Sequence, residues 1–265
     1  MIDTHCHLQY PGLSEDVVSV LDRARAAGVT KVIVPGTGLT TSEEALVLSE
    51  KYANVYAALG VHPVDDEASP DDAAAIRTLF ASGKGKLVAV GEVGMDYYHL
   101  PTGDAEIAKA KDEQVARLYQ FTQLARELNL PLIIHSRECF SDLYARLREW
   151  VPNHKTVIHC FVGNQEEADM WLDLGYHLSF TNILTYPKNG ELREVAARVP
   201  AGRFMLETDA PFLPPRTRRG GLCEPSDVVS VAECLAEVRG ETLASISEQT
   251  TSTAESFFGL NQFLR

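Results

Sequence analysis

The sequence predicts an α/β protein of the (β/α)8 TIM-barrel class, folded as a single domain over residues 1–265. Eight short apolar, β-branched runs alternate with amphipathic segments along the chain, a pattern typical of parallel strands covered by helices. The length suits eight such units. No linker, low-complexity tract or block of charge interrupts the alternation. We therefore expect one closed barrel rather than an open doubly wound sheet or two domains.

Each predicted strand is a run rich in Val, Ile, Leu or aromatic residues, which favour a pleated and largely buried backbone. In chain order these strands are residues 1–7, 31–36, 55–62, 86–94, 130–136, 155–161, 176–180 and 203–210.

Helical spacing fills the intervals between the predicted strands. Apolar residues recur three or four positions apart within 17–28 and within 118–128, which predicts one buried helix face in each. At 40–45 and 69–74 a hydroxyl residue precedes acidic residues, the typical start of a helix.

The composition limits the possible functions. No apolar run is long enough to cross a membrane, and we expect neither a secretory leader nor an obligate protein partner. Five scattered cysteines without C-x2-C spacing argue against disulfides or a structural zinc site and predict a reducing cytoplasm. The net charge of −13 counts against a broad cationic nucleic-acid surface. It leaves room for a phosphate bound locally by metal ions.

Imidazoles and carboxylates fall at or near the ends of five predicted strands. They are His5, His7, Glu92, His135, His159 and Asp209. In a barrel the carboxyl ends of the strands form one rim, where active sites are assembled, so we expect these side chains to converge. Four imidazoles and two carboxylates exceed the needs of one tetrahedral metal. We therefore predict two divalent cations bridged by Glu92, with Cys6 and Cys160 facing away into the core.

Several motifs resemble those of the TatD-like metal-dependent deoxyribonucleases, a branch of the amidohydrolase superfamily. In order they are DTHCHL, GVHP, GEVGMDYY, IIHSRE, VIHCFVG and LETDAPFLPP followed by EP, and the likeness covers residues 1 to about 258. The resemblance implies that His5, His7 and Asp209 hold one ion, and that His135 and His159 hold the other. It also implies 3′–5′ exonuclease activity on DNA with two divalent cations, Mg²⁺, Zn²⁺ or Mn²⁺.

The sequence departs from the family pattern at three points. Met95 replaces the usual leucine of the GLD motif, a substitution that conserves volume. The segment after His62 lacks the second histidine of the HPH motif, and Cys223 stands where the family has the asparagine of RNEP. The last change removes a polar group near the predicted substrate mouth.

Three residues are predicted to act in catalysis. Asp209 would take the proton of an activated water, Glu92 would bridge the cations, and His62 would contact a substrate phosphate or protonate the leaving group. Four more residues are predicted to bind substrate: Arg137, Asp96, Glu224 and Arg216.

Other residues near the predicted rim have less specific roles. Asp96 could instead orient a metal ligand. Tyr97 and Tyr98 could stack on a base, and the arginines of residues 214–221 could form a basic patch. For His99, His154 and His177 the sequence predicts no role at the rim.

Two other functions remain open from the sequence. The same site could hydrolyse a small amide, an ester or an aminoacyl-tRNA, which the acidic charge and Cys223 would favour. A metal-binding protein without catalysis is less consistent with the sequence, because Asp209, the expected proton acceptor, is present.

Overall fold

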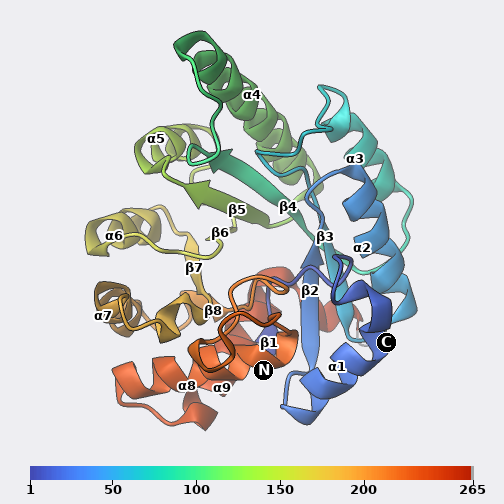
Figure 1. Ribbon diagram of the computed structural model, residues 1–265. Coiled ribbons are helices and arrows are strands. Elements are labelled where there is room, and N and C mark those ends of the chain that lie inside the picture. Colours follow the sequence, from blue (N-terminus) through green and yellow to red (C-terminus); the bar gives the residue numbers. More distant parts are fainter. Residues whose placement is uncertain (264–265) are drawn as a thin grey trace.

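The computed structural model describes residues 1–263, and it confirms the predicted barrel. Eight strands pair in parallel in the order of the chain and stand at the centre of the molecule (Figure 1). They are β1 (Ile2–Asp3), β2 (Lys31–Pro35), β3 (Val55–Leu59), β4 (Leu87–Asp96), β5 (Leu132–Arg137), β6 (Thr156–Ile158), β7 (His177–Phe180) and β8 (Phe204–Leu206).

The first and last strands meet just beyond their carboxyl ends. Cys6 and Ala210 form an isolated parallel bridge, and the Asp209 N–H donates to the His5 carbonyl at 2.9 Å. The Asp3 carboxylate spans the same seam, because it accepts from the Thr208 hydroxyl at 2.6 Å and from the Thr208 N–H at 3.0 Å. These bonds bring the segments that follow β1 and β8 side by side.

Helices surround the strands (Figure 1). They are α1 (Val17–Ala26), α2 (Leu39–Lys51), α3 (Asp72–Ala81), α4 (Asp104–Leu128), α5 (Phe140–Trp150), α6 (Gln165–Asp173), α7 (Gly190–Arg198), α8 (Val228–Arg239) and α9 (Leu243–Phe258). Side chains alternate along each strand, so Val32 and Val34 belong to one apolar cluster and Ile33 to another. Within residues 1–263, no helix has the length and apolarity needed to cross a bilayer.

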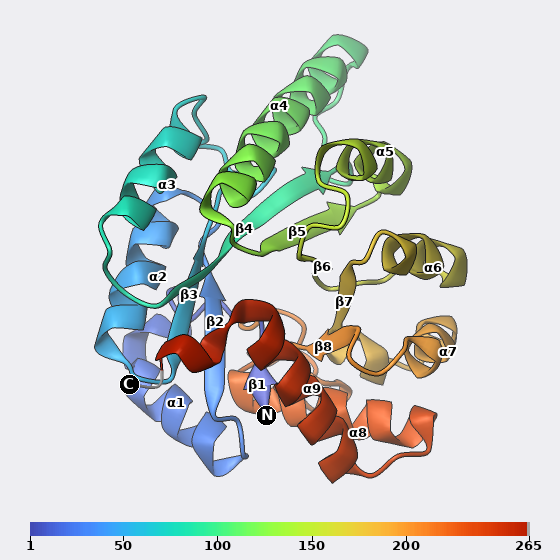
Figure 2. The ribbon, with the colours of Figure 1, turned by 180° about the vertical axis from the view of Figure 1, so that it is seen from behind.

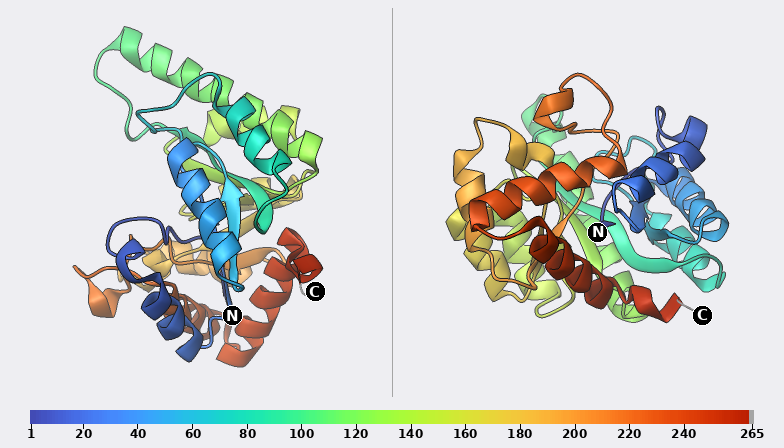
Figure 3. Two further views of the ribbon diagram at one scale, coloured as in Figure 1. Left: turned by 90° about the vertical axis from the view of Figure 1, so that its right-hand side faces the viewer. Right: turned by 90° about the horizontal axis from the view of Figure 1, so that it is seen from below.

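Helix α9 covers the amino ends of the strands. Phe257 and Phe258 are buried in one cluster with residues of most strands, among them Ile33, Tyr56 and Met205. Figure 2 shows α9 in front of the barrel, on the side turned away in Figure 1, and Figure 3 shows it beside α8 when seen from below. This end of the barrel is therefore filled by the last helix of the chain.

Four strands end at least three residues earlier than the sequence predicts: β3 at Leu59, and three others that precede predicted ligands. β1 ends at Asp3, β6 at Ile158 and β8 at Leu206, whereas the apolar runs continue for several residues. Beyond each of these strands the backbone still forms hydrogen bonds to neighbouring segments of the barrel, but without a regular ladder. Four of the six predicted metal ligands lie in these irregular segments: His5, His7, His159 and Asp209.

Candidate metal centre

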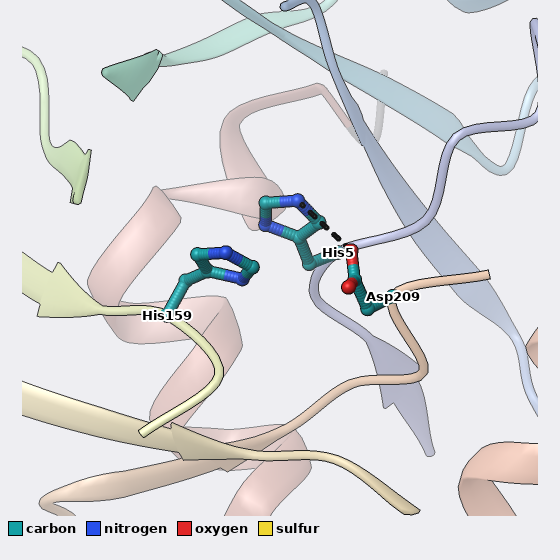
Figure 4. A group of neighbouring side chains, drawn as sticks. All are labelled: His5, His159 and Asp209. Carbon is teal, nitrogen blue, oxygen red and sulfur yellow. Dashed lines mark ion pairs between the residues drawn. The ribbon is translucent and has the colours of Figure 1, made fainter. Parts of the chain in front are cut away.

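Two imidazoles from the segment after β1 meet one carboxylate within β4 and another from the segment after β8. The Nε2 atoms of His5 and His7 lie 3.3 Å apart. The Glu92 Oε2 atom is 3.2 Å from His5 Nε2 and 3.8 Å from His7 Nε2, while Asp209 Oδ1 is 3.7 and 3.4 Å from the same two nitrogens. Figure 4 shows His5, His159 and Asp209 pointing toward one another.

This spacing fits a divalent cation. Ligand atoms bound tetrahedrally at 2.0–2.1 Å lie about 3.3–3.4 Å apart, close to the distances of 3.2–3.8 Å that join the imidazoles of His5 and His7 to the carboxylates. Two imidazole nitrogens that face each other at 3.3 Å can share one proton or one cation. Imidazole and carboxylate are the ligands that zinc and manganese accept readily.

The other oxygen of Glu92 faces a second group of imidazoles. Glu92 Oε1 lies 2.9 Å from His135 Nδ1, 3.0 Å from His159 Nε2 and 3.5 Å from His62 Nε2. Glu92 is 3% exposed, so its carboxylate is confined between the two groups. All six predicted ligands are therefore brought together, with one carboxylate between their two halves.

Glycines allow β4 to carry Glu92 into this position. A Cβ at Gly60 would lie 2.6 Å from the Gly91 carbonyl carbon, and a Cβ at Gly94 would lie 2.0 Å from the His135 carbonyl oxygen. The bare backbones let β3, β4 and β5 approach closely around Glu92.

The imidazoles and carboxylates shift one another's ionisation. Burial alone would raise the pKa of the Glu92 carboxyl, but His159, His62 and His5 outweigh it and hold that pKa well below its usual range. At Asp209 burial likewise opposes a hydrogen bond from His7 and the nearby imidazoles, and the pKa of Asp209 is also lowered. Both carboxylates are thus held ionised, the form in which they bind cations.

A second set of carboxylates fixes two of the imidazoles from outside. His159 directs Nε2 at Glu92 and Nδ1 at Glu207 Oε1, 3.2 Å away. His135 directs Nδ1 at Glu92 and Nε2 at Asp96 Oδ2, 3.2 Å away. Metal-binding histidines commonly donate their other ring N–H to such a partner.

Sequence reasoning does not identify Glu207 or Gln114 as part of this centre. Glu207 is 2% exposed and accepts from the Cys160 N–H as well as facing His159. The buried Gln114 side chain of α4 accepts from the Asp96 N–H and donates to the Asp96 carbonyl. Spacing offers a signal for Glu207, which lies two residues before Asp209 on an extended segment; nothing in the sequence points to Gln114.

The tautomer of His62 follows from a backbone contact. Its Nδ1 accepts from the Val64 N–H at 3.3 Å, so the proton of the neutral ring is on Nε2. Burial lowers the pKa of His62 to about 3, which keeps the ring neutral near pH 7. Although its Nε2 could join Glu92 and His135 in a metal-binding group, this tautomer presents a donor there.

A cavity of about 840 Å³ opens above the ligands. Arg137 is the one Arg or Lys side chain that lines it within the described residues, and Asp65, Asp66 and Glu67 form an acidic lip. Tyr10 and Phe212 supply its aromatic surface.

Other predicted substrate-binding residues lie away from this cavity. Glu224 forms a bidentate pair with Arg23, with atoms 2.7 and 3.0 Å apart. Arg216 is exposed, its N–H donating to Thr185, and Arg218 pairs with Asp227. None of these side chains lines the cavity.

Three predictions near β4 need correction. Tyr97 does not face the cavity; its hydroxyl donates to Asp142. Tyr98 does not line the cavity either; the Arg137 guanidinium lies over one face of its exposed ring, 3.8 Å from the ring centre. His99, for which the sequence predicts no role at the rim, lines the cavity and lies 2.8 Å from Asp96, because the chain turns back after β4.

The predicted orientation of the cysteines holds for one of the two. Cys6 is fully buried in the apolar core. Cys160 is partly exposed; it has a positive φ of 47°, and its N–H donates to Glu207 Oε1 at 2.6 Å.

Comparison with known proteins gives the family. A family model described as TatD related DNase matches residues 2–259. The chain belongs to this family. The TatD homologue YJJV of Escherichia coli K12 has the same fold, with a TM-score of 0.90, 33% identity and 98% coverage of both chains. The predicted resemblance is confirmed, and with it the class of metal-dependent hydrolase.

Two relatives in the TatD-related family carry different names. The uncharacterized metal-dependent hydrolase YabD of Bacillus subtilis (strain 168) is 36% identical over 98% of this chain and 100% of its own. The 3′-5′ ssDNA/RNA exonuclease TatD of Pantoea ananatis (strain LMG 20103) is 34% identical, again over 98% and 100%.

Proposed function

We propose that this protein removes nucleotides from the 3′ end of single-stranded DNA or RNA with the help of two divalent cations. The observation that carries the proposal is the position of Glu92, whose two oxygens each lie 3.2 Å or less from an imidazole of a different group. The exonuclease named among the relatives supports the substrate. Five free cysteines suit a reducing cytoplasm.

The resemblance to the TatD-like nucleases implies two ligand sets among these side chains. His5, His7 and Asp209 would hold one cation, His135 and His159 the other, and Glu92 would touch both. The imidazole-rich donor set favours Zn²⁺ or Mn²⁺ over Mg²⁺, which prefers oxygen. Bound cations would supply an activated water and neutralise charge on a phosphodiester.

The protein's own residues then divide the remaining work. Asp209 is ionised and its side chain is 18% exposed, so its carboxylate can accept a proton from the attacking water. His62 presents an N–H at Nε2, suited to a phosphate oxygen or to the leaving oxygen. Arg137 lines the same cavity and is positioned to bind a phosphate by charge-assisted hydrogen bonds.

The test compares substrates on metal-reconstituted protein. Single-stranded DNA, an aminoacyl-tRNA and a panel of small esters are each incubated with the wild type and with Asp209→Asn. We expect mononucleotide release from DNA, abolished by the substitution. Glu224→Gln, which changes a carboxylate outside the cavity, serves as the matched control and should retain activity. Hydrolysis of esters alone would overturn the proposal.

One observation favours a second candidate, hydrolysis of a small amide or ester. The acidic lip formed by Asp65, Asp66 and Glu67 repels a long polyanion, and only Arg137 opposes it among the Arg and Lys side chains that line the cavity within residues 1–263. A short strand end can still bind despite the acidic lip, because cations at the centre can neutralise one or two phosphates.

A further inference from the structure

Phe212 lies at the mouth of the cavity with half of its surface exposed. Among the large hydrophobic side chains that are exposed within the described residues, it is the one that lines this cavity. Leaving an aromatic ring in water forfeits a free energy that burial would supply. Single exposed apolar residues are common elsewhere on protein surfaces, but this one stands three residues after Asp209.

The ring is held in place by its neighbours. The Phe212 N–H donates to the Asp209 carbonyl at 2.9 Å. Its ring meets that of Tyr10 edge to face, with centroids 6.0 Å apart. Tyr10 is itself stacked on His7 at 4.7 Å and bonded through its hydroxyl to Thr37 at 2.6 Å. Phe212 is therefore a supported surface, 6.3 Å from the His7 ring.

We propose that Phe212 is the stacking platform for one of the two nucleobases that flank the scissile phosphate. This inference rests on the proposed function and specifies how that site recognises a strand end. Every nucleobase has a flat π-face, so stacking on an aromatic ring binds single strands with little dependence on sequence. The ring adjoins the ligands of the first cation, which would bind the phosphate attached to that nucleoside.

The rest of the mouth explains why stacking is needed. Within the described residues, the cavity is lined by an acidic lip and by one Arg or Lys side chain, Arg137. It therefore has few groups that can bind a phosphate backbone. Base stacking supplies affinity that does not depend on charge. Tyr97 and Tyr98, the candidates from the sequence, contact Asp142 and Arg137 instead.

The experiment measures each side-chain variant on strands with and without the base that would stack. Substrates are a 3′-ended single-stranded DNA and the same strand with one abasic nucleotide at the terminal or the penultimate position. Proteins are the wild type, Phe212→Ala, Phe212→Leu and Phe212→Tyr, all loaded with the same metal. Tyr119→Ala is the matched control, because Tyr119 on α4 is similarly exposed at 47% but lies outside the cavity.

On the intact strand, Phe212→Ala should raise KM by about 5- to 150-fold, the range expected from the loss of one base–aromatic stack. The value of kcat should change little, as for the loss of uniform binding. Phe212→Leu should behave like the alanine variant, while Phe212→Tyr and Tyr119→Ala should resemble the wild type. For the wild type, removing the base at one of the two positions should raise KM by the same factor. For Phe212→Ala, removing that base should raise KM no further.

The outcomes separate the two proposals. If the wild type releases no nucleotide from DNA, the proposed function fails. If the wild type releases nucleotides, two results would overturn the stacking platform and leave the nuclease proposal standing. Phe212→Ala could be fully active, or it could be impaired by the same factor on the intact strand and on both abasic strands. Nucleotide binding to the metal-loaded protein, measured by fluorescence anisotropy of a labelled trinucleotide, gives a second readout independent of turnover.

Discussion

Replacing Glu207 tests whether an outer carboxylate prepares His159 to bind a cation. Glu207 Oε1 lies 3.2 Å from His159 Nδ1 and accepts the Cys160 N–H at 2.6 Å. With the ring proton on Nδ1, Nε2 is free of hydrogen and directed at Glu92, 3.0 Å away. Glutamine at this position keeps an oxygen acceptor but removes the charge that makes the imidazole a stronger ligand.

The expected size of the effect follows from these contacts. Loss of such an outer partner typically costs 10- to 100-fold in metal affinity, or about 1.4–2.7 kcal/mol. Glu207→Leu should in addition leave the His159 ring without an acceptor at Nδ1, while the Cys160 N–H keeps the Ser179 hydroxyl, 3.3 Å away, as its acceptor. At about 1–3 kcal/mol for one unsatisfied buried group, this variant should also lose about 1–3 kcal/mol of unfolding free energy, whereas Glu207→Gln should fold nearly as stably as the wild type.

Metal affinity is measured by competition with a chromophoric chelator for Zn²⁺ and for Mn²⁺, and stability by urea denaturation of the metal-free protein. The control Glu224→Gln removes a charge from a carboxylate that pairs with Arg23, so its metal affinity should equal that of the wild type. Unchanged affinity for both cations in Glu207→Gln would refute the reasoning, since His159 would then need no charged partner.

Three further predictions concern other parts of the chain. Burial, with Arg203 nearby, lowers the pKa of His177 from 6.5 to about 4; the unfolded chain therefore takes up a proton first, and stability should fall by about 1–2 kcal/mol between about pH 7 and pH 5. His177→Asn should abolish that share of the pH dependence in urea denaturation. Phe258→Ala should cost about 3–5 kcal/mol of unfolding free energy, because Phe258 fills the amino end of the barrel; a loss below about 1 kcal/mol would contradict this. For Arg137→Gln, the plot of log kcat/KM on single-stranded DNA against log salt should be shallower by about 0.7, because the variant neutralises one phosphate fewer, and an unchanged slope would place Arg137 off the nucleic acid.

The order of strands and the convergence of the six ligands could be predicted because both follow from local pattern. Alternating apolar and amphipathic segments give the barrel, and residues that end parallel strands must share a rim. The lengths of β1, β6 and β8 could not be predicted. Their apolar runs continue past Asp3, Ile158 and Leu206, but the backbone there bonds across the barrel without a regular ladder.

The division between inner and outer carboxylates was also beyond the sequence. Glu92 and Glu207 are both acidic, both lie in or just after a strand, and both are nearly inaccessible. Only the direction of each side chain separates them: Glu92 faces five imidazole nitrogens, four of them within 3.5 Å, whereas Glu207 faces one imidazole and a backbone N–H. The imidazoles around Glu92 offset the cost of burying its charge and hold its carboxyl ionised.

The same reasoning explains why the sequence points to the wrong aromatic residues at the mouth. Tyr97 and Tyr98 follow β4 directly, so their proximity to Glu92 along the chain suggests a role there. Past the end of β4, however, the Tyr97 hydroxyl donates to Asp142 and the Tyr98 ring contacts the Arg137 guanidinium, and neither tyrosine lines the cavity. Phe212 reaches the cavity because the segment after β8 is tied to β1 across the barrel seam. Position relative to that seam, and not distance along the sequence, determines which aromatic ring can meet a substrate.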